Sequence, residues 1–240
     1  MDEETQAILM LVENLKLSVP QIFPWFYMSG DIEHICSSTN LDIRVKELID
    51  IISLFKEVIL RLKEHSLSFV SACLPQLLFG LARVMAVTPD PSQLNLLQGL
   101  KFLRHTFVKF IQTLTDRSGS MEVSHGLIFS QPQTSQDLIF SLISCIEACL
   151  SSNDAAGFRA VLAWFVKQIL VAPQTTSESA SLFLAELHSL LMSRLGPICV
   201  LAPARLSFTR SDEVLYEGIL KEVATCLHHL VEAKVNPSFK

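Results

Sequence analysis

The sequence lacks the motifs that the common nucleotide-dependent and hydrolytic enzymes require. Its eight glycines are isolated, and none precedes a Lys-Ser or Lys-Thr pair, so no phosphate-binding loop is present. It contains no G-x-S-x-G turn for a nucleophilic serine and no H-E-x-x-H pattern for a zinc hydrolase. We therefore expect a protein that is not an enzyme, with no catalytic residues, no cofactor and no small-molecule substrate.

Close cysteine pairs are also missing. The six cysteines, at positions 36, 73, 145, 149, 199 and 226, lie in apolar segments and form no C-x-x-C, whereas zinc ligands come in close pairs and disulfide frameworks belong to short secreted chains. The first residues, MDEETQAILM, are acidic, unlike the basic start of a secretory signal peptide. These features predict buried, reduced thiols in an intracellular protein of the cytoplasm or nucleus.

The adjacent histidines His228 and His229 are the best candidates for metal ligands. His228 lies one helical turn from Glu232, and Glu222 is near the same side. Neighbouring side chains on a helix point about 100° apart, so both histidines cannot face one ion, and the set remains a two-ligand fragment. We expect no metal site.

Charged residues are scarce, at 18 % of the chain, and the mean hydropathy is +0.40. The longest uncharged run, residues 66–82, has a length at the lower limit for a membrane span, but it contains three serines, a proline and a glutamine. We interpret it as a buried central helix. A membrane-proximal adaptor, with 20–29 and 66–82 at a lipid surface, is the alternative.

Apolar residues recur at spacings of three and four almost everywhere, and strict alternation is absent beyond a few positions. This period predicts an all-α fold. Nine helical segments are expected, near 3–18, 20–29, 42–64, 66–87, 91–116, 135–151, 154–171, 176–195 and 211–234. In the fifth, an apolar stripe should be buried: Leu96, Leu100, Leu103, Phe107, Phe110, Ile111 and Leu114.

Capping residues and connections divide the chain further. Asp90 with Pro91, Asn153 and Thr175 are expected to begin helices, while Gly196 with Pro197 closes one, and 196–211 is then an apolar connection. A second long connection, rich in serine, glycine and glutamine, suggests subdomains 1–118 and 135–240 joined by the loop 119–134.

Most connections have two to six residues, so successive helices should pack antiparallel. The pairs 42–64 with 66–87 and 135–151 with 154–171 resemble HEAT or armadillo repeats, which stack into curved α-solenoids. The likeness covers nearly the whole chain but is one of pattern, with irregular spacing and no repeat consensus. An irregular helical bundle therefore stays open as the alternative fold.

Two groups of residues are candidates for partner binding. The stretch VPQIFPWFYMSGD contains Trp25, Phe26 and Tyr27, which are either a hydrophobic cap on the helix 42–64 or an exposed anchor for a partner. The fifth helix contains Lys101, Arg104, His105 and Lys109, which we interpret as one basic, solvated face that an acidic partner would contact. Reversing the charge of Lys101 and Arg104 is then expected to leave the fold intact.

These features favour a non-catalytic intracellular scaffold for protein–protein interactions, a fragment of a larger helical-repeat protein. An isoelectric point near 5.8 argues against direct nucleic-acid binding. The resemblance to HEAT-type scaffolds implies one further alternative, a component of a nuclear chromosome-maintenance or meiotic recombination assembly.

Overall fold

The computed structural model describes residues 3–22, 41–87, 89–115, 132–166, 191–209 and 212–235. All regular secondary structure in these ranges is helical, which confirms the all-α prediction. Trp25, Phe26 and Tyr27 lie outside the described residues. The same holds for positions 176–190 of the helix expected near 176–195, and for most of the connection 119–134.

The chain divides into two compact units, Met1–Ser141 and Leu142–Lys240. The division falls within a helix and not within the predicted loop 119–134, so that domain boundary stays a prediction. The N-terminal unit contains a 3-10 turn, Lys63–Ser66, and these helices: α1 (Glu3–Ile22), α3 (Leu41–Leu62), α4 (Leu67–Met85), α5 (Leu94–Thr115) and the first half of α7 (Pro132–Ser151).

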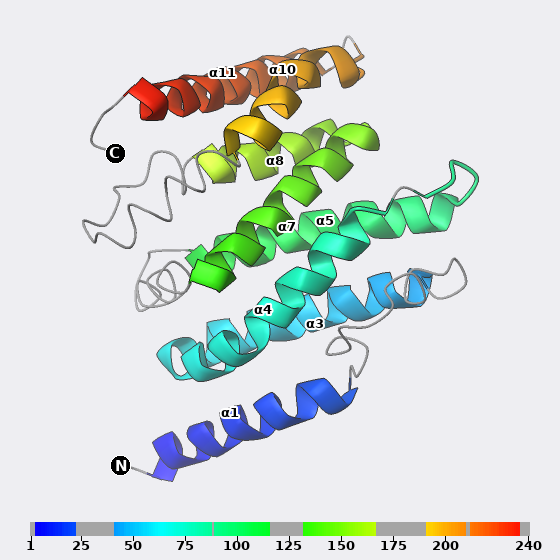
Figure 1. The fold of residues 1–240 in the computed structure, drawn as a ribbon. Coiled ribbons are helices and arrows are strands. Elements are labelled where there is room, and N and C mark those ends of the chain that lie inside the picture. Colours follow the sequence, from blue (N-terminus) through cyan, green and yellow to red (C-terminus); the bar gives the residue numbers. More distant parts are fainter. Residues whose placement is uncertain are drawn as a thin grey trace. The chain divides into compact units, whose positions relative to one another are not determined.

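The core of the N-terminal unit is built around α3 and α5, which lie side by side and run in the same direction (Figure 1). Near their starts, a Cβ atom built on Gly99 would lie only 3.2 Å from Val45 Cγ1. Near their ends, the rings of Phe55 and Phe110 meet edge to face with centroids 6.1 Å apart. Contacts at both ends in the same order show that the two helices are parallel neighbours.

The helix between them in sequence, α4, runs the opposite way and completes the core. Phe69 of α4 lies 4.6 Å from Phe55 of α3, centroid to centroid. The hydroxyl of Ser141 in α7, itself buried, lies 2.8 Å from the Leu78 carbonyl oxygen of α4. The apolar stripe predicted for α5 is buried in full.

Among the described residues, α4 is the one helix long and apolar enough to cross a membrane. The core helix of a soluble protein passes the same test, and nine residues of α4 are buried. The helix continues through Pro75. Its packing against α1 and α3 matches the interpretation as a central helix.

The C-terminal unit contains the second half of α7, α8 (Ala155–Phe165), a π-helical turn (Leu191–Leu195), α10 (Gly196–Arg205) and α11 (Glu213–Val235). Asp154, not Asn153, is the N-cap of α8, because its side chain accepts a hydrogen bond of 3.2 Å from Gly157 N. Asn153 instead takes a left-handed conformation with φ 54°, which asparagine tolerates, and accepts a bond of 2.8 Å from Ser207 N.

In this unit α8 and α11 are also neighbours that run in the same direction (Figure 1). Arg159, near the start of α8, lies across Gly218, near the start of α11, where a Cβ atom would meet its guanidinium group. The π-helical turn is tied to α7 by Arg194, whose Nη2 lies 2.8 Å from both carboxylate oxygens of Glu147.

The structure corrects several predicted helix ends. α1 continues through Pro20 to Ile22, although a break was expected at residue 19. Asp90 accepts hydrogen bonds from Ser92 in a turn, and α5 begins only at Leu94. The segment after Leu195 forms the helix α10, because Pro197 is in its first turn, where its missing N–H costs no hydrogen bond.

Candidate interaction surfaces

The basic face predicted on α5 contains fewer solvent-facing side chains than expected. Lys101 and Lys109 are exposed and His105 is half-buried, but Arg104 is only 3 % exposed. Arg104 lies one turn after Leu100 and one turn before Phe107, so helical geometry places it on the packed side. The prediction that all four residues share one solvated face is therefore wrong for Arg104.

This correction changes the expected effect of charge reversal. Arg104→Glu would place a carboxylate in a buried position, which is costly without a matched partner. Lys101 and Lys109 are the positions where a charge can be reversed with little effect on stability, because exposed charges contribute little.

The exposed side of α5 also presents a large aromatic ring. Phe102 is 60 % exposed. It follows Lys101 directly, and Lys109 comes two helical turns later. Leu94, at the start of the same helix, is 66 % exposed. We define the α5 face as Leu94, Lys101, Phe102 and Lys109. It contains two positive charges and an exposed aromatic side chain, and aromatic residues are enriched at protein-binding surfaces.

Sequence reasoning missed Phe102 because attention went to the apolar stripe and to the charges. The signal was present, since Phe102 directly follows Lys101 and lies off the stripe that contains Leu100 and Leu103. An aromatic residue on the polar side of an amphipathic helix lacks a core role, which makes it a candidate for binding.

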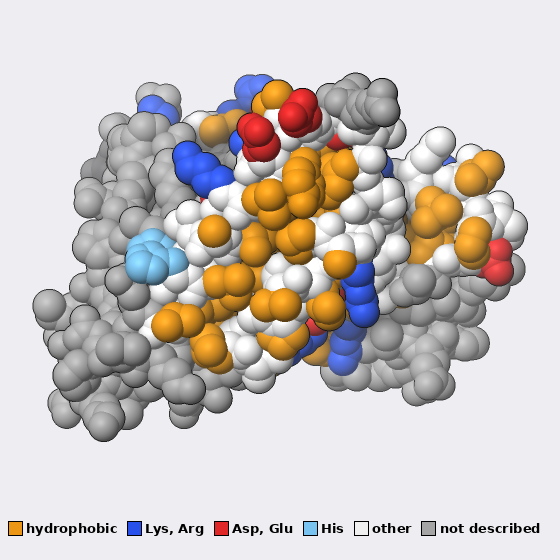
Figure 2. Space-filling view, turned by 90° about the horizontal axis from the view of Figure 1, so that it is seen from above, with side chains coloured by type: hydrophobic (Ala, Val, Ile, Leu, Met, Phe, Trp, Pro, Cys, Tyr) orange, Lys and Arg blue, Asp and Glu red, His pale blue; other side chains and the backbone are white. Residues whose placement is uncertain are grey.

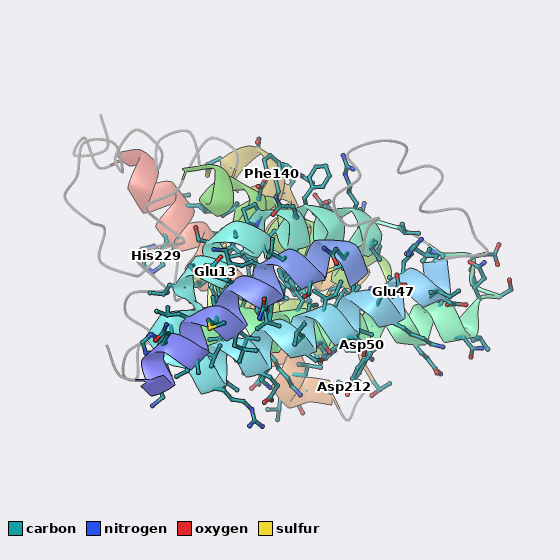
Figure 3. The ribbon with its side chains drawn as sticks, turned by 90° about the horizontal axis from the view of Figure 1, so that it is seen from below. Glu13, Glu47, Asp50, Phe140, Asp212 and His229 are labelled. Atoms are coloured by element: carbon teal, nitrogen blue, oxygen red, sulfur yellow. The ribbon has the colours of Figure 1, made fainter. Side chains whose placement is uncertain are left out.

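Acidic residues on α1 and α3 are largely engaged within their own helices. Lys16 Nζ lies 2.7 Å from Glu13 on α1, and Arg44 lies 2.8 Å from Glu47 on α3. Glu13, Glu47 and the exposed Asp50 are labelled in Figure 3. Glu57 and Arg61 form a third such pair, on α3, at 3.0 Å. Such pairs support single helices and do not form a binding site.

A second surface lies on α10 and α11. Figure 2 shows hydrophobic side chains gathered over these helices, with acidic and basic side chains at the edges. Every exposed large hydrophobic side chain found in the described part of the C-terminal unit belongs to this surface: Val200, Leu201, Val214, Leu220 and Val231. Exposure confined to two adjacent helices indicates a patch and not scattered residues.

Beneath this patch, two thiols join α10 to α11. Cys199 and Cys226 are fully buried, and their Sγ atoms lie 3.9 Å apart in a hydrogen bond. This bond, together with burial, raises the pKa of the Cys226 thiol far above its ordinary value. At the start of α11, hydrogen bonds from the Thr209 hydroxyl and N–H lower the pKa of Asp212 and keep it ionised.

The histidines considered as metal ligands lie next to each other on α11. Their ring centroids are 5.5 Å apart and their planes are inclined by 58°. Within the ranges that the structure describes, no group of three or more His, Cys, Asp or Glu side chains is arranged to hold a metal ion.

Comparisons with protein-family models, with curated protein sequences and with solved structures give no match for this chain.

Proposed function

We propose that this chain is a non-catalytic scaffold for protein–protein interactions with a HEAT-like or armadillo-like arrangement of helices. The observation that supports this proposal most is a packing pattern that occurs in each unit. Two helices that are not consecutive, α3 with α5 and α8 with α11, lie parallel and in contact, and shorter or oppositely directed helices join them.

Stacked helical repeats produce such contacts, since a helix of one pair packs beside the equivalent helix of the next. Proteins of this architecture present long rows of side chains to partners and need no catalytic residues. The low charge of the sequence and its lack of catalytic motifs agree with that function.

We assign the partner site to the α5 face. Lys101 and Lys109 provide positive charge for an acidic partner, while Phe102 provides an aromatic anchor. A contribution of Trp25, Phe26 and Tyr27 to partner binding stays a prediction from the sequence. A component of a nuclear chromosome-maintenance or meiotic recombination assembly would be the same kind of scaffold with particular partners.

The test compares two variants of the full chain in cells, using in-cell crosslinking followed by mass spectrometry. Lys101→Glu with Phe102→Ser alters the α5 face, and Ile43→Ser with Lys46→Glu is the matched control on α3, where Ile43 is 54 % exposed. We expect both variants to keep the melting temperature, and the α5 variant alone to lose at least tenfold in the yield of specific partners. Equal partner recovery from both variants would contradict this site.

A further inference from the structure

Two thiols of the C-terminal unit lie in direct contact although 27 positions separate them in the sequence. Cys199 of α10 and Cys226 of α11 are both fully buried, and their Sγ atoms are 3.9 Å apart. The sulfur atoms of a disulfide are about 2.05 Å apart, so each sulfur would have to move by about 1 Å. A change in the side-chain torsion angle χ1 moves a sulfur atom by this much. The two thiols are therefore close enough for a covalent cross-link between the two helices.

The helix that contains Cys199 is weakly held. α10 has 10 residues, fewer than an isolated helix needs to be stable, and Pro203 within it lacks a backbone N–H. The buried residues of α10 are Cys199 and Ala202, whereas the 11-residue helix α8 buries six. Val200 and Leu201 of α10 are 64 % and 42 % exposed. Because α10 has so little buried contact, we expect it to open locally before the rest of the C-terminal unit unfolds.

Polar contacts fix the chain just before and just after α10. Before it, Arg194 Nη2 lies 2.8 Å from both carboxylate oxygens of Glu147 on α7. After it, the backbone N–H of Ser207 donates a hydrogen bond of 2.8 Å to Asn153 Oδ1. The side chains of Arg194 and Glu147 are 34 % and 40 % exposed, so water competes for this ion pair. Removing the ion pair should therefore free the start of α10 and raise the rate of local opening.

While α10 is packed on α11, the two thiols are protected from oxidants (Figure 1). The side chains of Cys199 and Cys226 are not exposed to solvent. The hydrogen bond between them, together with burial, raises the pKa of the Cys226 thiol, so this thiol stays protonated. A thiolate reacts with oxidants, and a thiol does not. Local opening of α10 brings both sulfur atoms into water and removes this protection.

We propose that Cys199 and Cys226 form a redox-controlled modification site, in which a hydroperoxide converts them to a disulfide that cross-links α10 to α11. First, one thiolate attacks an oxygen atom of hydrogen peroxide and the O–O bond breaks. This step forms a sulfenic acid, and the leaving hydroxide takes up the proton of the thiol to give water. Next, the second thiol attacks the sulfur of the sulfenic acid, the S–S bond forms, the S–O bond breaks, and a second water leaves with the thiol proton. The two sulfur atoms are oxidised and the peroxide is reduced, so two thiols and one peroxide give one disulfide and two waters.

The cross-link controls one part of the surface. It prevents α10 from opening, so Val200 and Leu201 stay in the apolar patch that α10 shares with α11. A thiol reductant breaks the disulfide by exchange and allows α10 to open again. The oxidised chain therefore presents the patch permanently, whereas the reduced chain presents it only while α10 is packed.

The first experiment treats the full chain with hydrogen peroxide, blocks the remaining thiols with iodoacetamide and digests the product with trypsin without reduction. Cleavage after lysine and arginine places Cys199 in the peptide 195–205 and Cys226 in the peptide 222–234. We expect mass spectrometry to find these two peptides joined. The oxidised chain should also melt about 5 °C higher in the transition of the C-terminal unit, because the cross-link restricts the unfolded chain. Dithiothreitol should reverse both changes.

Cys226→Ala is the test variant, and Cys149→Ala is its matched control, because both thiols are fully buried in helices of the same unit. Cys226→Ala should abolish the joined peptides and the rise in melting temperature after oxidation. Cys149→Ala should keep both.

The second experiment leaves all the cysteines in place and measures how fast the cross-link forms. Arg194→Gln removes the ion pair with Glu147, and we expect it to speed cross-linking about threefold or more, because it makes local opening more frequent. Arg44→Gln is the matched control. It removes an ion pair of the same length, 2.8 Å, with Glu47 in the N-terminal unit, and it should not change the rate.

Two results would overturn the proposal. One is a native chain in which peroxide leaves the two peptides separate or joins either of them to another cysteine. The other is an equal effect of Arg194→Gln and Arg44→Gln on the rate of cross-linking. Both results are separable from the scaffold proposal, which depends on the α5 face.

Discussion

Arg104 and Asp154 are the two charged side chains that the described residues bury, and the position of each on its helix accounts for its burial. Arg104 has Leu100 and Phe107 one turn to either side on α5. Asp154 is buried because its carboxylate caps α8 through Gly157 N. From residue type alone, Arg104 was predicted to be solvated, because local sequence does not show which side of a helix is covered. The N-cap of α8 was attributed to Asn153, the neighbour of Asp154.

The buried thiol pair predicts a loss of stability at alkaline pH. The pKa of Cys226 is raised in the folded chain, so the folded thiol stays protonated while the unfolded thiol ionises near its ordinary pKa of about 8.5. The stabilisation is complete below that pH and is lost as the pH rises. By pH 10 this one group should reduce the free energy of unfolding by about 2 kcal/mol.

Urea unfolding at pH 7, 8, 9 and 10 measures this effect. Cys226→Ala should be less stable than the native chain at pH 7, because it leaves a small cavity and removes the bond to Cys199. Its stability should nevertheless fall less steeply between pH 8 and 10. Identical slopes for the two proteins would show that Cys226 titrates normally in the folded chain.

At the scale of elements, α3 and α5 approach each other closely near their starts, at Gly99 and Val45. Gly99 lets the helices approach until Val45 limits them. We expect Gly99→Ala to change the free energy of unfolding by less than about 1 kcal/mol, since the gain in helix propensity offsets a small displacement of Val45. Gly99→Leu should destabilise by about 1 to 3 kcal/mol, because its side chain overfills the contact.

Thermal and urea unfolding of both variants, each with and without Val45→Ala, provides the measurement. Val45→Ala makes room at this contact. It should therefore reduce the free energy of unfolding less in the Gly99→Leu variant than in the native chain. If the losses in the free energy of unfolding caused by Gly99→Leu and by Val45→Ala simply add, the larger side chain at position 99 is accommodated without displacing Val45.

The elements themselves were largely predictable, because the period of apolar residues depends only on the local backbone. Their ends were less so. At Pro91 and Gly196 the same residues are compatible with a turn, a helix end or a helix start, and the structure selects a later start for α5 and a new helix, α10. Pro20 was expected to interrupt a helix that in fact continues for two more residues.

At the scale of the whole molecule, each compact unit has its own set of buried rings. Phe107 belongs to the N-terminal unit and Phe158 to the C-terminal unit, and both are fully buried. We expect calorimetry to resolve two unfolding transitions. Phe107→Ala should cost about 3 to 5 kcal/mol and lower one transition by about 10 °C, while Phe158→Ala should lower the other.

The result that contradicts this expectation is a single transition that both variants shift equally, which would mean that the two units unfold together. A loss below about 1 kcal/mol for Phe107→Ala would contradict its place in the core.

The candidate surfaces were the part least accessible from sequence. Leu220 and Val231 are apolar residues on α11, like the buried Ile219 and Leu230, and sequence does not distinguish the two pairs. The difference arises from α8 and α10, which cover one side of α11 and leave the other exposed. Exposure of this kind depends on contacts between segments far apart in the chain.

The parallel contact of α3 with α5 has a consequence for the order of events during synthesis. Val45 and Phe55 leave the ribosome about 55 residues before Gly99 and Phe110, their neighbours in the folded unit. At about 5 to 20 residues per second, the apolar side of α3 waits several seconds for its main partner. In that interval α4 can contact it but α5 cannot, so the nascent chain is most open to aggregation or to chaperone binding before α5 emerges.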